Sequence, residues 1–147
     1  MQKKKGFTLI ELLLTICIIS IISSAMAAGI TSYFKTRNKY EARFTQNCIL
    51  GVISNAKQYC REKNKYGDVV FDLSANEIYF KSDFSIKDKF YLPKNVKLSG
   101  VSNYNKKIEI NNRGIISGDA CTITLKDLSG NLYYITVCVG SFYVEIK

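Results

Sequence analysis

A long apolar run lies close to the start of the chain. From Phe7 to Ile30 every residue is apolar, small or hydroxylated except Glu11, and three lysines at positions 3–5 precede the run. A helix over these residues would be about 36 Å long, enough to cross a hydrocarbon core of about 30 Å. The lysines favour an N-terminus in the cytoplasm, so we expect a single-pass protein of the plasma membrane whose later residues lie outside the cytoplasm.

From Thr31 to about Lys65 the helical period continues, but the pattern becomes amphipathic. Apolar residues recur at mostly four-residue steps, and most of the charged residues lie off this stripe. We therefore expect the same helix to continue with its stripe covered by a sheet; a coiled-coil partner is the alternative. Cations in the last turn and Gly67 are expected to end the helix. The expected stripe consists of Tyr40, Phe44, Cys48, Ile49, Val52, Ile53, Ala56, Tyr59 and Cys60.

Beyond Gly67 the apolar period becomes two, with turn residues between short runs, which predicts a meander of strands. Residues 111–114 are expected to form a turn, and residues 127–130 a three-residue hairpin loop that pairs Asp127 with Asn131. The predicted strands are Asp68–Asp72, Glu77–Phe80, Lys89–Leu92, Val96–Leu98, Lys107–Ile110, Cys121–Lys126, Leu132–Val139 and Phe142–Ile146.

These patterns predict an α+β fold in which a long N-terminal helix packs on a C-terminal antiparallel β-sheet domain. At 147 residues the chain holds one modest domain beside the membrane segment. The expected parts are a leader at 1–6, a membrane-spanning helix at 7–30, its amphipathic continuation at 31–66 and a β-sheet domain at 67–147.

Composition argues against an enzyme. The chain has no histidine, which excludes Ser-His and Cys-His pairs and His-rich zinc sites. The aspartates fall at expected turns and strand ends, where they shape the backbone or solvate loops. No cofactor and no metal site are expected.

Five cysteines raise the question of disulfides. Cys48 and Cys60 lie about 18 Å apart on one expected helix, beyond the roughly 7 Å limit for a disulfide. A two-residue hairpin loop would set Cys121 opposite Cys138, whereas the three-residue loop sets Cys121 opposite Val137. Only the second register keeps one face of both strands apolar. We therefore predict free, buried thiols.

The residues Gly6-Phe7-Thr8-Leu9-Ile10-Glu11, between the lysines and the apolar run, resemble the prepilin signature of type IV pilins and pseudopilins. The resemblance implies that a prepilin peptidase cleaves between Gly6 and Phe7 and that Phe7 becomes the N-methylated N-terminus. It also implies assembly with other pilin or pseudopilin subunits through the N-terminal helix, first in the membrane and then at the cell surface or in a filament.

Glu11 is the exception that needs a reason, since a charge inside a spanning helix costs on the order of 2.5–3.5 kcal/mol. Cleavage would create an α-amino group with a reference pKa of about 7.7–8, largely protonated at pH 7. That cation can neutralise Glu11 of a neighbouring subunit. Such a heterologous contact, repeated without closing, generates a helical filament.

Other signals are possible in the same run. Ala25-Met26-Ala27 fits a secretory signal peptidase, which would release a secreted β-domain, and Cys17 could end a lipoprotein signal, although Ile16 is too bulky before it. A plain signal anchor is a third alternative. The embedded Glu11 and the six signature residues in order favour the prepilin interpretation.

The strand region has Leu92-Pro93 before a strand, glycines at 114 and 118, and a closing hairpin. In these features it resembles the C-terminal domain of H-type minor pseudopilins of type II secretion and their competence-system relatives. Many major pilins carry a proline where this chain has Ala27-Ala28-Gly29, and its absence favours a minor subunit. Type IV pilus, competence pseudopilus and secretion pseudopilus all stay open. A DNA contact during uptake is the second hypothesis, because residues 87–91 and 103–107 mix cations with aromatics.

Overall fold

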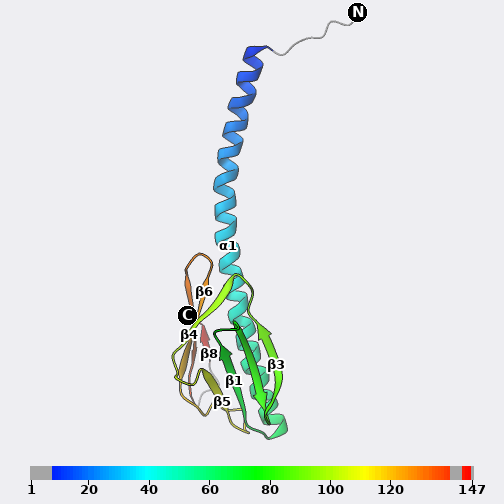
Figure 1. The fold of residues 1–147 in the computed structure, drawn as a ribbon, viewed down its shortest axis with the longest axis vertical. Helices are drawn as coiled ribbons and strands as arrows, with labels where there is room; N and C mark the ends of the chain where they lie inside the picture. Colours follow the sequence, from blue (N-terminus) through cyan, green and yellow to red (C-terminus); the bar gives the residue numbers. More distant parts are fainter. Residues whose placement is uncertain (1–7, 140–143, 147) are drawn as a thin grey trace, which may run out of the picture. The chain divides into compact units, whose positions relative to one another are not determined.

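This computed structural model describes residues 8–139 and 144–146. One long helix, α1 (Leu9–Lys63), precedes eight short strands (Figure 1). The strands are β1 (Gly67–Asp72), β2 (Glu77–Ser82), β3 (Ser85–Tyr91), β4 (Val96–Val101), β5 (Lys107–Ile110), β6 (Cys121–Asp127), β7 (Leu132–Val137) and β8 (Val144–Ile146). The chain forms two compact units, one ending at Arg37 and one running from Asn38 to Lys147, so the second half of α1 belongs with the strands.

The strands form two antiparallel sheets, in the orders β3-β2-β1-β5 and β4-β6-β7-β8. Each of the eight predicted strands overlaps an observed one, although Phe142 and Tyr143, predicted to begin the last, lie outside the described residues. The expectation of a meander is wrong, because the chain leaves the first sheet for β4, returns for β5 and leaves again for β6. Both β4 and β5 bury alternate residues, so their period alone does not assign them to a sheet.

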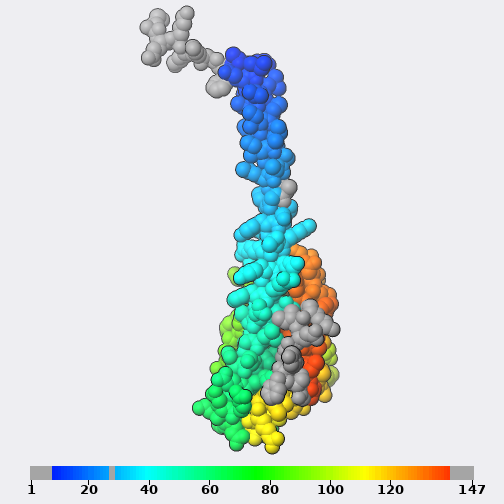
Figure 2. All heavy atoms as spheres, turned by 180° about the vertical axis from the view of Figure 1, so that it is seen from behind, coloured from blue at the N-terminus to red at the C-terminus, as the bar shows by residue number. Residues whose placement is uncertain are grey.

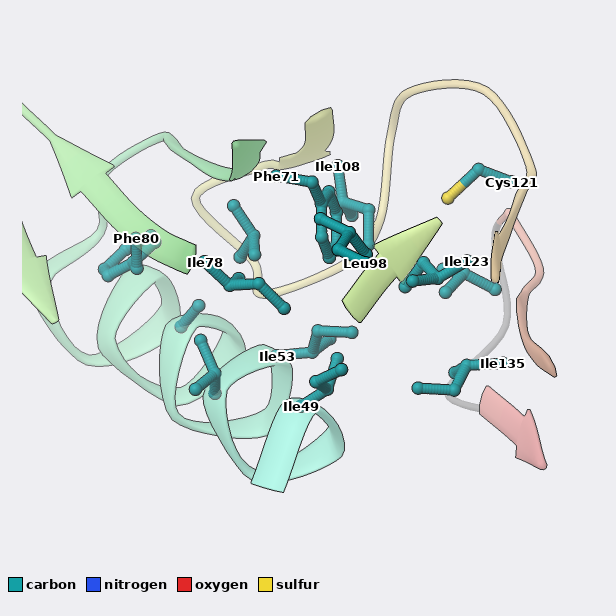
Figure 3. Close-up of a cluster of buried hydrophobic side chains, with 14 of the residues drawn as sticks. Ile49, Ile53, Phe71, Ile78, Phe80, Leu98, Ile108, Cys121, Ile123 and Ile135 are labelled. Atoms are coloured by element: carbon teal, nitrogen blue, oxygen red, sulfur yellow. The ribbon is translucent and has the colours of Figure 1, made fainter. Parts of the chain in front are cut away.

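The core lies between α1 and the inner faces of the two sheets (Figure 3). Ile49 and Ile53 of α1 face side chains that come from both sheets. Burying a side chain of this size stabilises the fold by about 1.5–3 kcal/mol. The core side chains labelled in the figure are Phe71, Ile78, Phe80 and Ile108 of the first sheet and Leu98, Cys121, Ile123 and Ile135 of the second.

The packed face of α1 differs from the predicted stripe at its N-terminal end. Tyr40 and Phe44 are exposed, by 71% and 53%, which corrects their assignment to the core. Thr45 and Gln46 are buried instead, and both are satisfied: Thr45 donates to the Glu41 carbonyl at 2.8 Å, and the Gln46 amide donates to the Tyr134 carbonyl at 3.1 Å. A polar residue can face the core when it finds such a partner. The rest of the stripe is buried at Ile49, Val52, Ile53, Ala56 and Cys60, whereas Cys48 and Tyr59 are half-buried.

The helix ends at Lys63, and Asn64, not Gly67, is the residue that caps it. Asn64 adopts a left-handed conformation (φ 52°), its N–H donates to the Arg61 carbonyl at 3.4 Å, and the Lys65 N–H donates to the Cys60 carbonyl at 3.0 Å. This is a Schellman cap with asparagine in place of glycine. Gly67 instead begins β1, where a side chain would collide with the Phe80 ring.

The strand predicted from Lys89 begins four residues earlier, at Ser85. The reason is the tight turn between β2 and β3, in which Asp83 and Phe84 both have positive φ, 52° and 59°. Such turns usually carry Asn-Gly, so the sequence gives no turn signal here. A bulge opposite Phe80 and Lys81 also leaves Lys87 of β3 unpaired and breaks the alternation of that strand.

The hairpin of β6 and β7 has the predicted register. Cys121 lies opposite Val137, Ile123 lies opposite Ile135, and the Asp127 N–H donates to the Asn131 carbonyl at 3.1 Å. The Asp127 carboxylate also accepts from the Asn131 N–H at 2.8 Å and the Tyr133 hydroxyl at 3.1 Å. Burial alone would raise the pKa of Asp127, but these hydrogen bonds outweigh it and lower the pKa below the usual value. Asp127 therefore shapes the turn, as predicted.

The predicted turn at residues 111–114 is present and lies against α1. Gly114 has φ 74°, and a Cβ there would lie 2.6 Å from the Lys57 carbonyl oxygen. Gly130 has a similar φ of 86° but open space around it. A side chain at Gly130 would strain only the backbone, whereas a side chain at Gly114 would strain the backbone and also collide with α1.

We predict that Gly130→Ala lowers the free energy of unfolding of the strand domain by about 1–2 kcal/mol, since only the backbone is strained. Gly114→Ala should lose about 1–3 kcal/mol more, because its methyl group also displaces the turn from α1. Urea unfolding of both full-length variants in detergent, followed by tyrosine near-UV circular dichroism, measures the difference. Equal losses would contradict the close approach of Gly114 to the helix.

Candidate functional site

Glu11 folds back onto Thr8 at the start of α1. Its carboxylate oxygen Oε2 accepts from the Thr8 backbone N–H at 2.9 Å and from the Thr8 hydroxyl at 3.0 Å. The Thr8 hydroxyl oxygen in turn accepts from the Glu11 backbone N–H at 3.4 Å. Gly6 and Phe7, the predicted cleavage and methylation positions, lie outside the described residues.

These contacts form a capping box, in which an N-cap threonine and a glutamate three residues on satisfy each other's backbone N–H groups. The negative carboxylate also suits the positive end of the helix dipole. Sequence reasoning singled out Glu11 but missed Thr8, although the spacing Thr-x-x-Glu was the available signal. Among the described contacts, none uses the second carboxylate oxygen Oε1. The cap is therefore compatible with a second donor from outside the helix.

The part of α1 that follows the cap packs against no other part of the described chain. Its large apolar side chains are exposed, from Leu9 through Ile22 to Ile30. By length and composition alone this helix could cross a membrane. Exposing apolar side chains to water on every turn of a helix is unfavourable. The segment is therefore suited to contact with lipid or with other helices.

Three hydroxyl groups in this segment are satisfied inside the helix. Thr15 donates to the Leu12 carbonyl, Ser20 to the Ile16 carbonyl and Ser24 to the Ile21 carbonyl, each at 2.8 Å. In hydrocarbon an unsatisfied polar group costs several kcal/mol, so this bonding removes the main penalty of the hydroxyls.

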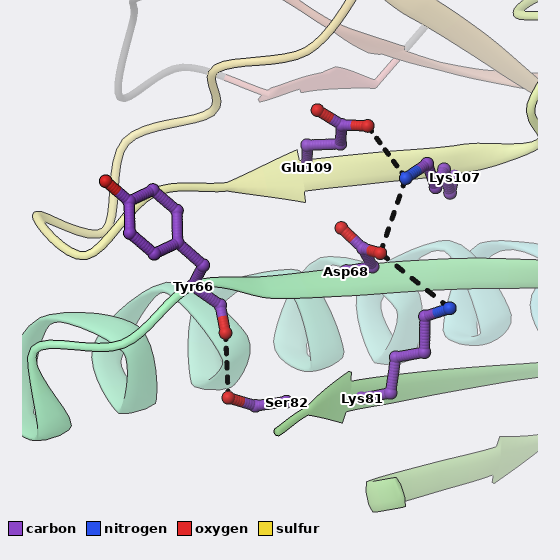
Figure 4. Close-up of polar contacts among 6 residues, drawn as sticks. All are labelled: Tyr66, Asp68, Lys81, Ser82, Lys107 and Glu109. Atoms are coloured by element: carbon purple, nitrogen blue, oxygen red, sulfur yellow. Dashed lines mark hydrogen bonds and ion pairs between the residues drawn. The ribbon is translucent and has the colours of Figure 1, made fainter. Parts of the chain in front are cut away.

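Two of the four lysines considered for a DNA contact, Lys89 and Lys107, form ion pairs with carboxylates. Lys107 lies 3.4 Å from Asp68 and 2.7 Å from Glu109, whose hydrogen bond raises the pKa of Lys107, and Lys81 also reaches Asp68 at 3.8 Å (Figure 4). Lys89 pairs with Glu77 at 2.9 Å. Except for the Lys107–Glu109 pair, which lies within β5, these ion pairs join neighbouring strands, and they do not favour a track for a phosphate backbone at these lysines.

The structure contains free cysteines in different surroundings. Cys60 and Cys121 are buried, and burial raises the pKa of each thiol to about 11, with a further contribution from Asp68 at Cys60. Cys48 is half-buried, and Cys17 and Cys138 are exposed. The prediction of buried thiols is therefore wrong for Cys138, which follows the last paired residue of β7.

The described residues contain no group of three His, Cys, Asp or Glu side chains that could hold a metal ion. What the site offers is a capped carboxylate at the start of an exposed apolar helix.

Residues 1–27 match the family described as the prokaryotic N-terminal methylation motif. The chain therefore carries the N-terminal signature of prepilins, and its long helix packed on antiparallel sheets is a pilin-like α+β fold.

A solved structure with a similar fold is the minor pseudopilin EpsH from the type 2 secretion system of Vibrio cholerae. The TM-score is 0.56 at 9% sequence identity, and the match covers 73% of this chain and 96% of that chain. No curated protein sequence matches the chain. At this identity the likeness shows the fold alone.

We predict that a water-soluble maleimide labels Cys138 in the native protein but labels Cys60 and Cys121 only after unfolding. A thiol pKa raised from 9.0 to about 11 lowers the reactive thiolate about 100-fold at neutral pH, and burial excludes the reagent as well. Mass spectrometry of the labelled peptides, with and without urea, gives the comparison. A bridge between Cys121 and Cys138 in non-reducing peptide maps would contradict both the redox state and the register of the hairpin.

Proposed function

We propose that the chain is a minor pilin-like subunit that is inserted in the membrane with its N-terminus in the cytoplasm. Prepilin peptidase cleaves it between Gly6 and Phe7, Phe7 is N-methylated, and the helix of residues 7–30 then carries it into a filament. The observation that supports this most is the methylation motif of residues 1–27, which covers the start of a helix whose apolar half is exposed in the part of the chain that the structure describes.

The proposal extends to the kind of subunit. The likeness of the fold to a minor pseudopilin, and the absence of a proline at Ala27-Ala28-Gly29, support a minor subunit of a pseudopilus over a major pilin. Secretion, competence and type IV pilus machines all use such subunits, and the proposal is the shared role in the filament. The competing proposal is a secreted β-domain released after Ala27.

Intact mass of the membrane-extracted protein tests the processing. We predict loss of residues 1–6 and addition of one methyl group at Phe7. Gly6→Leu should accumulate as the uncleaved precursor, because a bulky side chain obstructs the extended backbone that a protease cleft requires. Gly29→Leu, the same change beyond the signature, serves as the control and should be cleaved normally. A mature protein that begins after Ala27 would support the secreted alternative instead.

Two substitutions of Glu11 distinguish the role of its negative charge from the role of its capping hydrogen bonds to Thr8. Glu11→Val and Glu11→Gln both remove the negative charge, so insertion into the membrane becomes easier. Glutamine can still accept from the Thr8 N–H as a capping residue, whereas valine cannot. If the carboxylate neutralises a neighbour's N-terminal amine, both variants are cleaved normally but enter filaments poorly, because the buried amine loses its counter-charge. Blots for precursor and mature forms in cells and in sheared filaments give the result, with Leu12→Val as the control.

The outcomes differ for each role. An uncleaved Glu11→Val protein would mean that the carboxylate serves recognition by the peptidase. Normal incorporation of Glu11→Gln together with failure of Glu11→Val would mean that the cap matters and the charge pair does not. Normal incorporation of both would fit a subunit at the tip, which has no subunit above it.

A further inference from the structure

The turn between β2 and β3 carries Phe84, the most exposed large apolar side chain of the described residues. Its relative exposure of 110% leaves the ring without a packing partner in the described chain. Single exposed apolar residues are common on protein surfaces and need no explanation by themselves. Phe84 differs because its backbone conformation is unfavourable as well.

Phe84 and Asp83 form a two-residue turn in which both residues have positive φ, 59° and 52°. A bulky L residue rarely adopts this left-handed conformation. The favoured sequences for such a turn are Asn-Gly and Asp-Gly, so glycine at position 84 would complete a favoured pair with Asp83 and remove the strain. A side chain that strains the backbone and gains no contact in its own domain indicates a role outside that domain.

Three contacts hold the turn in place. Lys65, just after α1, pairs with Asp83 at 2.5 Å, and the Ser85 hydroxyl donates to the Ser82 carbonyl at 3.0 Å. The Ser82 hydroxyl in turn donates to the Tyr66 carbonyl at 2.7 Å (Figure 4). An aromatic ring on a fixed turn loses little conformational entropy when it binds, because the backbone is already ordered and the side chain has only two torsions.

A surface pocket of about 430 Å³ adjoins Phe84, and Tyr66, which is 69% exposed, is also part of its lining. Figure 2 shows the green segments that line it at the lower end of the strand domain. The four charged residues of the lining form two ion pairs, Lys65 with Asp83 and Lys81 with Asp68 at 3.8 Å. This surface is therefore neutral although the whole chain is basic, and it suits an apolar partner better than an anionic one.

The size of this surface limits the kind of partner that it can hold. Stable complexes of free proteins use about 20–30 residues on each side, whereas nine residues line this pocket and the turn. A contact this small is useful when another interaction already keeps the partner close, because a high effective concentration supplies the remaining free energy. In the proposed filament, the exposed apolar half of α1 supplies that interaction.

A second copy of this chain is a poor receiver for the ring. Two other pockets of the described chain, one at Asn103 and one at Ser54, are lined by no apolar side chain. A copy would have to receive Phe84 in the pocket beside its own Phe84, so that both copies use the same surface. Such an isologous contact closes on itself and cannot continue along a filament.

We propose that Phe84 anchors a contact with a different subunit of the same filament, which receives the ring in an apolar socket. The inference rests on the proposed function as a filament subunit. Aromatic anchors of this kind carry a large share of the binding energy of an interface. The strained turn is then the means by which the ring is presented to the partner.

Phe84→Gly distinguishes a binding role from a structural one. In urea unfolding of the full-length chain in detergent, the midpoint should rise, because glycine adopts a positive φ without strain. The amount of the variant in sheared filaments should nevertheless fall about tenfold, as expected for the loss of an anchor. Tyr104→Ala removes another exposed ring, 99% exposed, from a different loop and should change neither result. A lower midpoint for Phe84→Gly, or its normal incorporation, overturns the inference.

A photoreactive side chain identifies the partner. We expect p-benzoylphenylalanine at position 84, which keeps an aromatic ring on the turn, to link to a different filament subunit on irradiation of cells that assemble filaments. The same group at position 104 should give no such link. Mass spectrometry of the linked peptides names the two chains. Links from position 84 to lipid alone, to a second copy alone, or to nothing contradict the proposed contact.

Blots for the mature form in the same samples distinguish this inference from the proposed function. If mature wild-type chain is present in filaments and Phe84→Gly enters them equally well, the contact at Phe84 is wrong and the filament role stands. If the wild-type chain is never cleaved or never enters filaments, the filament role fails, and the partner assigned to Phe84 fails with it.

Discussion

Packing of one face of α1 against both sheets is the interaction on which the strand domain depends. The buried face runs from Ala42 to Cys60 and closes a core that neither sheet could close alone, since each has only four strands. The crossing of the chain between the sheets joins them further, and Asn76 adds a polar link: its side chain, at the turn between β1 and β2, donates to the Val96 carbonyl and accepts from the Leu98 N–H. The second half of the helix is thus part of the domain and not a stalk that carries it.

The first half of the helix meets the opposite constraint. It has no packing partner in the described chain, and in lipid such a segment would have to satisfy every polar group within the helix itself. Thr8 and Glu11 satisfy the first turn, and hydroxyls such as Thr15 and Ser20 bond to carbonyls of the preceding turn. Glu11 is tolerated in such a segment because the cap gives its charge hydrogen-bond donors on the helix itself.

Much of the fold followed from local pattern, and the failures have physical causes. The long helix, the strands and the register at Cys121 could be predicted because period, turn chemistry and face matching agreed there. Hydrophobicity alone places Tyr40 and Phe44 in the core, but both are exposed. Gln46 is buried instead, because its side-chain amide finds a hydrogen-bond acceptor in the Tyr134 carbonyl. The turn at Phe84 contains no glycine, so the sequence does not indicate it. The sheet to which β4 belongs is decided by its pairing with the distant β6 and not by local pattern. At the candidate site, Glu11 stood out by its charge, whereas Thr8 could be recognised only by its spacing from Glu11 in a Thr-x-x-Glu capping box.

The two halves of the helix also imply a division of labour in assembly. An apolar helical surface gives attraction but little discrimination, because leucine and isoleucine side chains pack acceptably in many registers. Directional contacts have to come from groups that fit one partner and reject another, and those are charged or hydrogen-bonding groups. In the first half of α1, the carboxylate of Glu11 is such a group. If it pairs with a neighbour's N-terminal amine, as proposed, it recognises a feature that every processed subunit shares. Selection of one particular partner would then depend on polar groups of the strand domain and not on the apolar helix.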